Sequence, residues 1–414
     1  MTTPQPPRKT SHAADSAPAR VLVVDDTPVN RDTLSRHVRR EGYVVDTADH
    51  GREALEKLRA EPFDLVLLDV QMPEMDGPQL LETLRNDAAL AHIPVIVVSA
   101  VDDIDSIVQC LELGADDYLP TLFRPAILRA RLSAALDRKR LRDAESLTHE
   151  LAVARKIQGD FLPESLPAAL GVQLEARLQP ARQVSGDFYD AFMLAPGGTI
   201  VLVVGDVCDK GLGAALFMAL FRSLIRASAD PVEGGAIQMI GGRRTVVRQS
   251  LEAATPADLL TRVAGFTNDY IARLHGRTNM FATAFLGALT PHTGQFDFVN
   301  AGHEPAIVIA PDGTTRELRP TGPALGLLPD APFYADEGRL ERGHSLFAFT
   351  DGLVEARSPA GEAFGTERLR DALRVNNTSA SNLVEGVMEA LDAFTGQAEQ
   401  YDDVTLLAAT RTSD

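Results

Sequence analysis

The sequence predicts two folded regions, a doubly wound α/β domain with a parallel sheet at about residues 20–138 and an α+β sandwich of two sheets flanked by helices beyond residue 166. Length is the first reason, because 414 residues are too many for one ordinary hydrophobic core. In the first region, short apolar runs alternate with amphipathic stretches, which is typical of parallel strands joined by helices. In the second region, strand-like runs with a period near two predominate.

The composition excludes several classes of function. The 58 acidic residues exceed the 40 basic ones, and the net charge of −18 argues against nucleic acid or an anionic membrane as a partner. The apolar run LFMALFRSLI is too short for a membrane span because Arg222 interrupts it. Cys110 and Cys208 cannot build a disulfide framework, which favours the reducing cytoplasm. Residues 1–18 lack the apolar core of a signal peptide and are predicted to be a disordered tail.

The expected strands of the first region are continuous apolar runs rich in β-branched residues, at 21–26, 65–70 and 94–100. The segments between them, such as 30–42 and 51–61, carry apolar residues at helical spacing and end near Gly or Pro. Strands buried on both faces and separated by helices define the doubly wound architecture, whose ligands bind beyond the carboxyl ends of the strands.

Three aspartates stand at those carboxyl ends: Asp25, Asp26 and Asp69. Converging carboxylates repel one another, so the arrangement calls for a hard cation such as Mg²⁺. With the cation bound, Asp69 could act as a nucleophile toward a phosphoryl group. Ser99 ends the next strand and offers a hydroxyl to a phosphoryl oxygen.

The words VLVVDD, LVLLDVQMPEMDG, VIVVSA and GADDYLP make residues 19–138 similar to a response-regulator receiver domain. The resemblance implies a flavodoxin-like sheet of five parallel strands and a cognate sensor histidine kinase as partner. It makes Asp69 the phosphoacceptor and places Mg²⁺ on Asp25, Asp26 and Asp69. Ser99 and Tyr118 would be the residues that respond to phosphorylation.

One position departs from the receiver pattern. Receivers carry a lysine shortly after the aromatic switch residue, whereas the run here is Tyr118, Leu119, Pro120, Thr121. Thr121 therefore occupies the lysine position, and the ammonium that would couple the phosphorylated aspartate to the switch is missing. Arg124 is a candidate replacement. We hypothesise that signalling through Asp69 is weakened or altered.

Residues 139–165 are predicted to be a helical linker. The stretch from Ala126 to Asp160 has no proline and many strong helix formers, and Pro163 and Pro167 end it. Its apolar residues form a broken stripe with spacings of three and four. Two interpretations stay open: an amphipathic helix that lies on its own domain, and a coiled coil that joins two copies of the chain as a homodimer.

The region at 166–412 contains seven expected strands, at 171–178, 199–207, 280–289, 296–302, 305–310, 345–352 and 402–410. Helices are expected at 213–229, 256–274 and 379–395. Two glycine pairs and little periodicity predict a mobile surface loop at 230–255.

Aspartates again stand at strand ends, namely Asp187, Asp206, Asp351, Asp402 and Asp403. Strand ends can gather at one rim of a sandwich. Acidic ligands without Cys or His partners suit Mg²⁺ or Mn²⁺ and disfavour zinc. Two such ions can lower the pKa of a shared water and neutralise phosphoryl oxygens.

The words ARKIQGDFLP, SGDFYD, GDVCDKGLGAALFMAL, NMFATAF, NAGHEP, FTDGLVEA and DDVT make residues 147–412 similar to the bacterial SpoIIE-like serine phosphatases, relatives of the 2C-type (PPM) metal-dependent protein phosphatases. The resemblance implies that Asp206 bridges two Mn²⁺ or Mg²⁺ ions, with the Val207 carbonyl as a backbone ligand. Asp351 and Asp402 would complete the second ion's site, so that Asp206, Asp351 and Asp402 form the catalytic set.

Two further aspartates have roles by the same resemblance. Asp187 would act on the first ion, directly or through water, and Asp403 would either join the ligands or orient its neighbour. The implied reaction is direct attack of metal-activated water on phosphoserine or phosphothreonine. His303, in NAGHEP, is the histidine considered as a general acid, and a structural turn role is favoured for it.

Three functions are compatible with these residues. The first is a phosphatase controlled by its receiver, and the complete aspartate set favours it. The second is a non-catalytic scaffold for partner switching, which loss of a metal aspartate would have favoured. The third is a constitutively active phosphatase with a degenerate, dimerising receiver, which Thr121 keeps open. By resemblance, the expected substrate is a serine-phosphorylated anti-sigma factor antagonist.

Overall fold

The contacts within the chain divide it into two compact units, Met1–Thr148 and His149–Asp414. The computed structural model describes residues 18–99, 104–194, 198–229, 236–240, 243–247 and 255–412. The predicted tail at 1–18 lies almost entirely outside the described residues. The division of the sequence into four parts stays a prediction.

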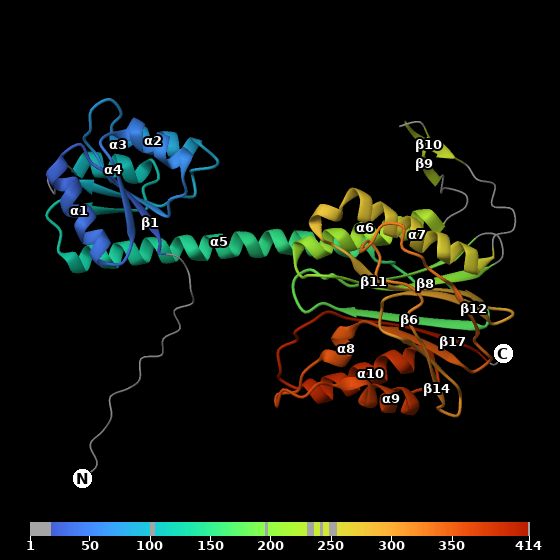
Figure 1. The fold of residues 1–414 in the computed structure, drawn as a ribbon. Coiled ribbons are helices and arrows are strands. Elements are labelled where there is room, and N and C mark those ends of the chain that lie inside the picture. The colour runs from blue at the N-terminus through green and yellow to red at the C-terminus, as the bar shows by residue number, and fades with distance from the viewer. Residues whose placement is uncertain are drawn as a thin grey trace, which may run out of the picture. The chain divides into compact units, whose positions relative to one another are not determined.

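The first unit is a five-stranded parallel sheet in the order β2-β1-β3-β4-β5, with helices on its two faces (Figure 1). Its strands are β1 (Arg20–Val24), β2 (Val44–Ala48), β3 (Leu65–Asp69), β4 (Val95–Ser99) and β5 (Asp117–Pro120). Its helices are α1 (Pro28–Arg40), α2 (Gly51–Ala60), α3 (Gly77–Asn86), α4 (Ile104–Glu112) and the first part of α5 (Pro125–Phe161). The predicted doubly wound fold is confirmed.

Alternating side chains of the central strands fill two separate cores in this unit. Leu22 and Val24 pack on the side of α2 and α3, whereas Val21 and Val23 pack on the side of α1 and α5. A strand buried on both faces must be apolar at every position, which is why the run at 21–24 is continuous. The polar residues that follow each run then stand at the carboxyl edge of the sheet.

Helix α5 carries residues of both units. Leu128, Leu132 and Leu136 are buried in the first unit's core, as the interpretation of an amphipathic helix on its own domain requires. Leu147 and Ile157 are more than half exposed. Gln158, near the end of the helix, is buried and accepts a hydrogen bond from the Ser185 amide at 2.9 Å, so the helix is anchored in both units. The coiled coil stays a prediction for the exposed stretch between these two parts.

The second unit contains two five-stranded antiparallel sheets. One has the order β15-β12-β11-β8-β7, and the other has the order β14-β13-β16-β17-β6. The strands of the first sheet are β7 (Phe188–Leu194), β8 (Thr199–Val207), β11 (Ala282–Thr290), β12 (Gln295–Ala301) and β15 (Asp336–Arg339). Those of the second are β6 (Val172–Gln179), β13 (Ala306–Ile309), β14 (Thr315–Leu318), β16 (Ser345–Phe349) and β17 (Val404–Arg411).

Helices cover the outer face of each sheet (Figure 1). Helices α6 (Leu212–Ala229) and α7 (Pro256–Leu274) lie on the first sheet, and α8 (Asp351–Glu355), α9 (Gly365–Val375) and α10 (Ala380–Thr395) lie on the second. A third core between the sheets joins residues such as Val204, Phe285 and Leu407. The unit is the predicted α+β sandwich, with helices α8 and α9 and strands β7, β14 and β15 of the two sheets added to the expected elements.

Helix α6 is the one described helix that is long and apolar enough to cross a membrane by length and composition. In this unit it is a core helix, because Met218, Phe221 and Ile225 are buried against the sheet. Arg222, which interrupts the apolar run, lies 3.0 Å from the buried carboxylate of Asp190.

The segment at 230–255 differs in part from the predicted loop. Strands β9 (Ala236–Ile240) and β10 (Arg243–Val247) form an antiparallel pair, so these residues are not a loop. In the sequence, Gly241 and Gly242 separate two runs that contain β-branched residues, and this pattern is typical of two paired strands. The rest of the segment lies outside the described residues.

Candidate functional sites

The first unit brings three aspartates together at the carboxyl edge of its sheet. Asp25 and Asp26 follow β1 and Asp69 ends β3, and one carboxylate oxygen from each lies within 4.8 Å of the others. Asp25 is buried, Asp69 is half-buried and Asp26 is exposed. The Thr27 and Val70 amides donate to Asp25 and Asp69 at 2.8 and 2.9 Å, which fixes both carboxylates. The geometry therefore fits a hard cation held by oxygen ligands.

The electrostatics of this trio show the same need for a cation. Burial and then the negative charge of Asp25 raise the pKa of Asp69 to about 7. Burial also raises the pKa of Asp25, and the charge of Asp26 adds to this effect. The negative charges of Asp25 and Asp26 thus make Asp69 harder to ionise, and a bound cation would reverse that penalty.

We expect Asp69→Asn to remove a pH-dependent loss of stability. The raised pKa of Asp69 means that the folded state holds this proton more tightly than the unfolded state. Wild-type stability should therefore be greatest at acid pH and fall as pH rises through about 7, whereas the amide cannot ionise. In EDTA, we expect the unfolding free energy of Asp69→Asn minus that of wild type to increase by about 2 kcal/mol from about pH 5 to about pH 8.

Denaturant unfolding followed by circular dichroism measures this difference. Saturating Mg²⁺ should reduce it, because the ion stabilises the wild-type carboxylates. Equal pH dependence of the two proteins in EDTA would contradict the assigned electrostatics.

The residues expected to respond to phosphorylation lie around the same edge. Ser99 is buried at the end of β4, and its carbonyl accepts a hydrogen bond from the Thr121 amide at 2.9 Å. Arg131 of α5 lies 5.2 Å from the ring centre of Tyr118. Arg124 is exposed, and no described ion pair joins it to Asp69. The structure thus gives no support for Arg124 as a replacement for the missing lysine.

In the second unit, the five predicted aspartates lie on both sheets. Asp187 precedes β7 and Asp206 lies near the end of β8, in the first sheet. Asp351 follows β16, and Asp402 and Asp403 precede β17, in the second. Figure 1 shows β8 and β17 in the two facing sheets. All five carboxylates interact electrostatically, Asp403 through its charge on Asp187 and Asp206, although no three of the five approach within 4.8 Å in the described structure.

Asp187 is the most deeply placed of these carboxylates. It is buried, and its Oδ2 accepts hydrogen bonds from the hydroxyls of Thr350 and Thr405 at 2.6 and 2.8 Å. Burial, and then the negative charge of Asp206, raise the pKa of Asp187 well above its ordinary value. The threonines thus fix one oxygen of Asp187 between the two sheets. Sequence reasoning missed Thr350 and Thr405, because their partner is more than 160 residues away.

Asp403 and Asp402 are held in different ways. Both oxygens of Asp403 accept from backbone amides, those of Ala181 at 2.7 Å and Gly186 at 2.9 Å. Asp403 therefore ties the segment before β7 to the start of β17, which favours the orienting role. Oδ2 of Asp402 instead pairs with Lys210 at 2.9 Å.

The carboxylates repel one another at this rim. Burial and then the charge of Asp351 raise the pKa of Asp206 to about 7, although a hydrogen bond with Asp187 opposes the shift. Burial and then the charge of Asp402 raise the pKa of Asp351. Ionised carboxylates accept hydrogen bonds but cannot donate them to one another, so this set of aspartates suits a hard divalent ion. The residues present therefore fit the metal ions that the resemblance implies.

His303 and Cys208 do not belong to this chemistry. His303 is buried, its Nδ1 lies 2.8 Å from the Thr283 hydroxyl, and burial lowers its pKa to about 4. It is therefore neutral at physiological pH, and its amide bonds to Asn300 at 2.8 Å, which fits the structural turn role. Cys208 is half-buried, and burial raises the pKa of its thiol, which makes it a poor nucleophile.

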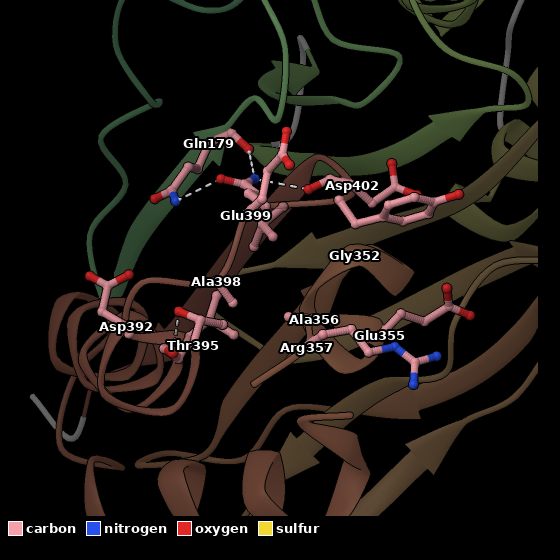
Figure 2. A pocket seen from close by; sticks show the side chains of 15 residues that line it. Gln179, Gly352, Glu355, Ala356, Arg357, Asp392, Thr395, Ala398, Glu399 and Asp402 are labelled. Carbon is pink, nitrogen blue, oxygen red and sulfur yellow. Dashed lines mark hydrogen bonds between the residues drawn. The ribbon is translucent and has the colours of Figure 1, made fainter. Parts of the chain in front are cut away.

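A cavity of about 200 Å³ adjoins Asp402. Figure 2 shows Glu355 and Arg357 on one side of it, and Asp392 and Glu399 on another. Gln400 donates to the carbonyl of Asp402 at 2.8 Å, which braces the loop before β17. Acidic side chains outnumber the single arginine among the labelled residues, so the cavity favours cationic over anionic groups.

The fold and the two acidic sites define the class: a receiver domain joined to a protein phosphatase domain of the PP2C type. The family profile described as "Stage II sporulation protein E (SpoIIE)" matches residues 196–412. The chain therefore belongs to the SpoIIE family. A second profile, "Response regulator receiver domain", matches residues 21–133. Together the two matches confirm both resemblances seen in the sequence.

Individual relatives match parts of the chain. "Protein IcfG" of Synechocystis sp. is 39% identical over 273 residues, which are 63% of this chain and 41% of that protein. "Response regulator MprA" of Mycobacterium ulcerans is 40% identical over 127 residues, 31% of this chain and 54% of the relative. The chain thus spans about half the length of these curated relatives.

A solved structure shares the fold of the second unit. The "SiaA-PP2C domain of Pseudomonas aeruginosa" covers 64% of this chain and 97% of its own, with a TM-score of 0.51 and 23% identity. This likeness concerns the fold.

Proposed function

We propose that this chain is a two-component response regulator whose output domain hydrolyses phosphoserine or phosphothreonine on a protein substrate, with metal-activated water. One observation carries the proposal. Five aspartates from two facing sheets interact at one rim, where burial and then the charge of Asp351 raise the pKa of Asp206 to about 7. Such an arrangement is unfavourable unless cations balance it, and phosphoryl transfer uses cations of that kind.

Each aspartate would have a distinct part. Asp206 would contact two Mn²⁺ or Mg²⁺ ions beside the Val207 carbonyl, and Asp351 and Asp402 would hold the second ion. The ions would lower the pKa of the attacking water and neutralise the phosphoryl oxygens. Asp187 would approach the first ion with the oxygen that Thr350 and Thr405 leave free.

Phosphate release from phosphopeptides tests this function. With Mn²⁺ present, the full chain should release phosphate from phosphoserine and phosphothreonine peptides and leave the matching phosphotyrosine peptide unchanged. EDTA should abolish release, and added Mn²⁺ should restore it. Release that continues in EDTA would contradict the metal-dependent reaction.

The partners follow from the two domains. We propose a sensor histidine kinase for the receiver, with Mg²⁺ at Asp25, Asp26 and Asp69, and a serine-phosphorylated anti-sigma factor antagonist as substrate. Both would meet this protein in the cytoplasm. The exposed side chains of Leu147 and Ile157 favour a homodimer through α5.

A second proposal, in which phosphorylation of Asp69 does not control the phosphatase, competes with the first. A specific observation supports it, because Thr121 replaces the lysine and Arg124 makes no described contact with the site. The competing proposal is a constitutively active phosphatase with a degenerate, dimerising receiver. A non-catalytic scaffold is less well supported, because every expected metal aspartate is present.

We expect Thr121→Lys to strengthen the response to phosphorylation. The ammonium would reach a site where phosphorylation adds negative charge beside Ser99, so the phosphorylated state would gain a charge-assisted hydrogen bond. Phosphatase rates measured with and without a small phosphodonor should differ at least about threefold more in the variant than in wild type.

Two controls interpret this result. Asp69→Asn should abolish any response in both backgrounds, and Thr121→Val should resemble wild type. A strong phosphodonor response in wild type that Thr121→Lys does not increase would contradict weakened coupling.

A further inference from the structure

Lys210 is the one lysine or arginine that pairs with any of the five phosphatase aspartates among the described residues. Its Nζ lies 2.9 Å from Oδ2 of Asp402, 2.9 Å from the Tyr401 carbonyl oxygen and 3.9 Å from the centre of the Tyr401 ring. The Lys210 and Asp402 side chains are 30% and 29% exposed, so an ion from solvent can reach the pair.

The backbone holds Lys210 in this place. It stands in the turn after β8, three residues beyond Val207, between two residues in left-handed conformations: Asp209 with φ 74° and Gly211 with φ 89°. A non-glycine residue with positive φ is uncommon and costs free energy. The turn thus directs a cation back onto the carboxylate that lies across the rim from Asp206.

Both oxygens of Asp402 already have a partner. Oδ2 pairs with the ammonium, and Oδ1 accepts from the Asp403 amide at 2.9 Å. No three of the five carboxylates lie within 4.8 Å in this arrangement, so the rim is more open than the receiver's metal site. An ammonium and a divalent cation repel strongly at a few ångströms.

We propose that the Lys210 ammonium is an internal counter-cation that competes with the second divalent ion for Asp402. This inference rests on the proposed metal-dependent function. The second ion binds only when Lys210 leaves the carboxylate, so Lys210 sets the metal concentration at which the phosphatase becomes active. It is a positioning residue that acts through Asp402. In the alternative, Lys210 orients Asp402 for the ion, and a neutral residue at position 210 would then weaken Mn²⁺ binding instead of strengthening it.

Calorimetric titration of the full chain with Mn²⁺ shows whether the Lys210 variants bind the ion more tightly or more weakly. Every protein in this titration carries Asp26→Asn, which weakens the receiver's own metal site. Lys210→Met removes the charge at similar length, Lys210→Gln is a second neutral variant, and Lys210→Arg keeps the charge. Lys156→Met, on the exposed surface of α5, is the matched control.

We expect both neutral variants to bind the weaker Mn²⁺ about tenfold more tightly, and Lys210→Arg and Lys156→Met to bind it as the parent does. The rise of melting temperature with Mn²⁺ should begin at a lower concentration in the neutral variants. Unchanged or weaker Mn²⁺ binding in both neutral variants would overturn the proposal.

A separate variant distinguishes failure of the inference from failure of the proposed function. Asp206→Asn should remove Mn²⁺ binding at this rim. Loss of binding in Asp206→Asn, with no effect of the Lys210 variants, would refute only the competition. Full binding in Asp206→Asn would refute the metal site itself.

Discussion

Asp206→Asn should lower kcat/KM for phosphate release at least about a hundredfold at saturating Mn²⁺, because this carboxylate would contact both ions. Burial, and then the charge of Asp351, raise its pKa to about 7, so a bound cation is needed to keep it ionised. The amide keeps the shape but removes the charge that holds two cations. The folded state should gain stability in EDTA, since one of several repelling charges is gone.

The matched control is Asp209→Asn, three residues further along the chain, in the turn that follows β8. Asp209 is exposed and has φ 74°, a conformation that asparagine adopts readily. This variant should retain activity within about twofold. An Asp206→Asn protein with more than half of the wild-type rate would show that the reaction does not use this rim.

Gly352→Ala should also abolish most activity, by displacing the loop that carries two aspartates. A β-carbon on Gly352 would overlap the carbonyl oxygen of Asp403 and lie 2.9 Å from its carbonyl carbon. Both are backbone atoms, so a rotamer change cannot relieve the overlap. The start of β17 must move, and we expect a loss of about 1–3 kcal/mol of stability and about a hundredfold in activity.

Gly265→Ala separates this effect from the general consequences of adding a methyl group. Gly265 lies inside α7 with open space around its β-carbon position. Alanine there should leave activity unchanged and stabilise the helix by about 0.5–1 kcal/mol. Thermal unfolding and phosphate release measured on both variants give the comparison. Normal activity in Gly352→Ala would mean that Asp402 and Asp403 need no fixed position.

The fold was predictable where the side-chain pattern has one physical solution. The run at 21–24 is apolar at every position because both faces are buried, and helix α7 has the predicted bounds because Thr255 caps it. Strand β15 (Asp336–Arg339) is mostly exposed and polar, so no pattern marks it. The β9–β10 pair differs from the prediction because glycine pairs are typical both of loops and of the turn between two paired strands.

The site was predictable to the extent that its residues stand at strand ends inside family motifs. The aspartates could be named from the sequence, but the hydroxyls of Thr350 and Thr405 could not, because their partner Asp187 is more than 160 residues away. Lys210 could likewise be read from the GDVCDKG motif, but its pairing with Asp402 could not be predicted from the sequence. Which oxygen a side chain meets depends on how the two sheets face each other.

The pairing of β6 with β17 has a consequence for biosynthesis. β6 is an edge strand whose ladder partner is β17, and the Ala181 amide bonds to Asp403 across 222 residues of chain. On the ribosome, the receiver's five strands are complete soon after residue 120 is made. Residues 402–411 are translated nearly three hundred residues later, by the numbering of the chain. A nascent chain thus contains all five receiver strands long before it has both sides of the acidic rim, so under the proposed function an unfinished translation product would lack phosphatase activity.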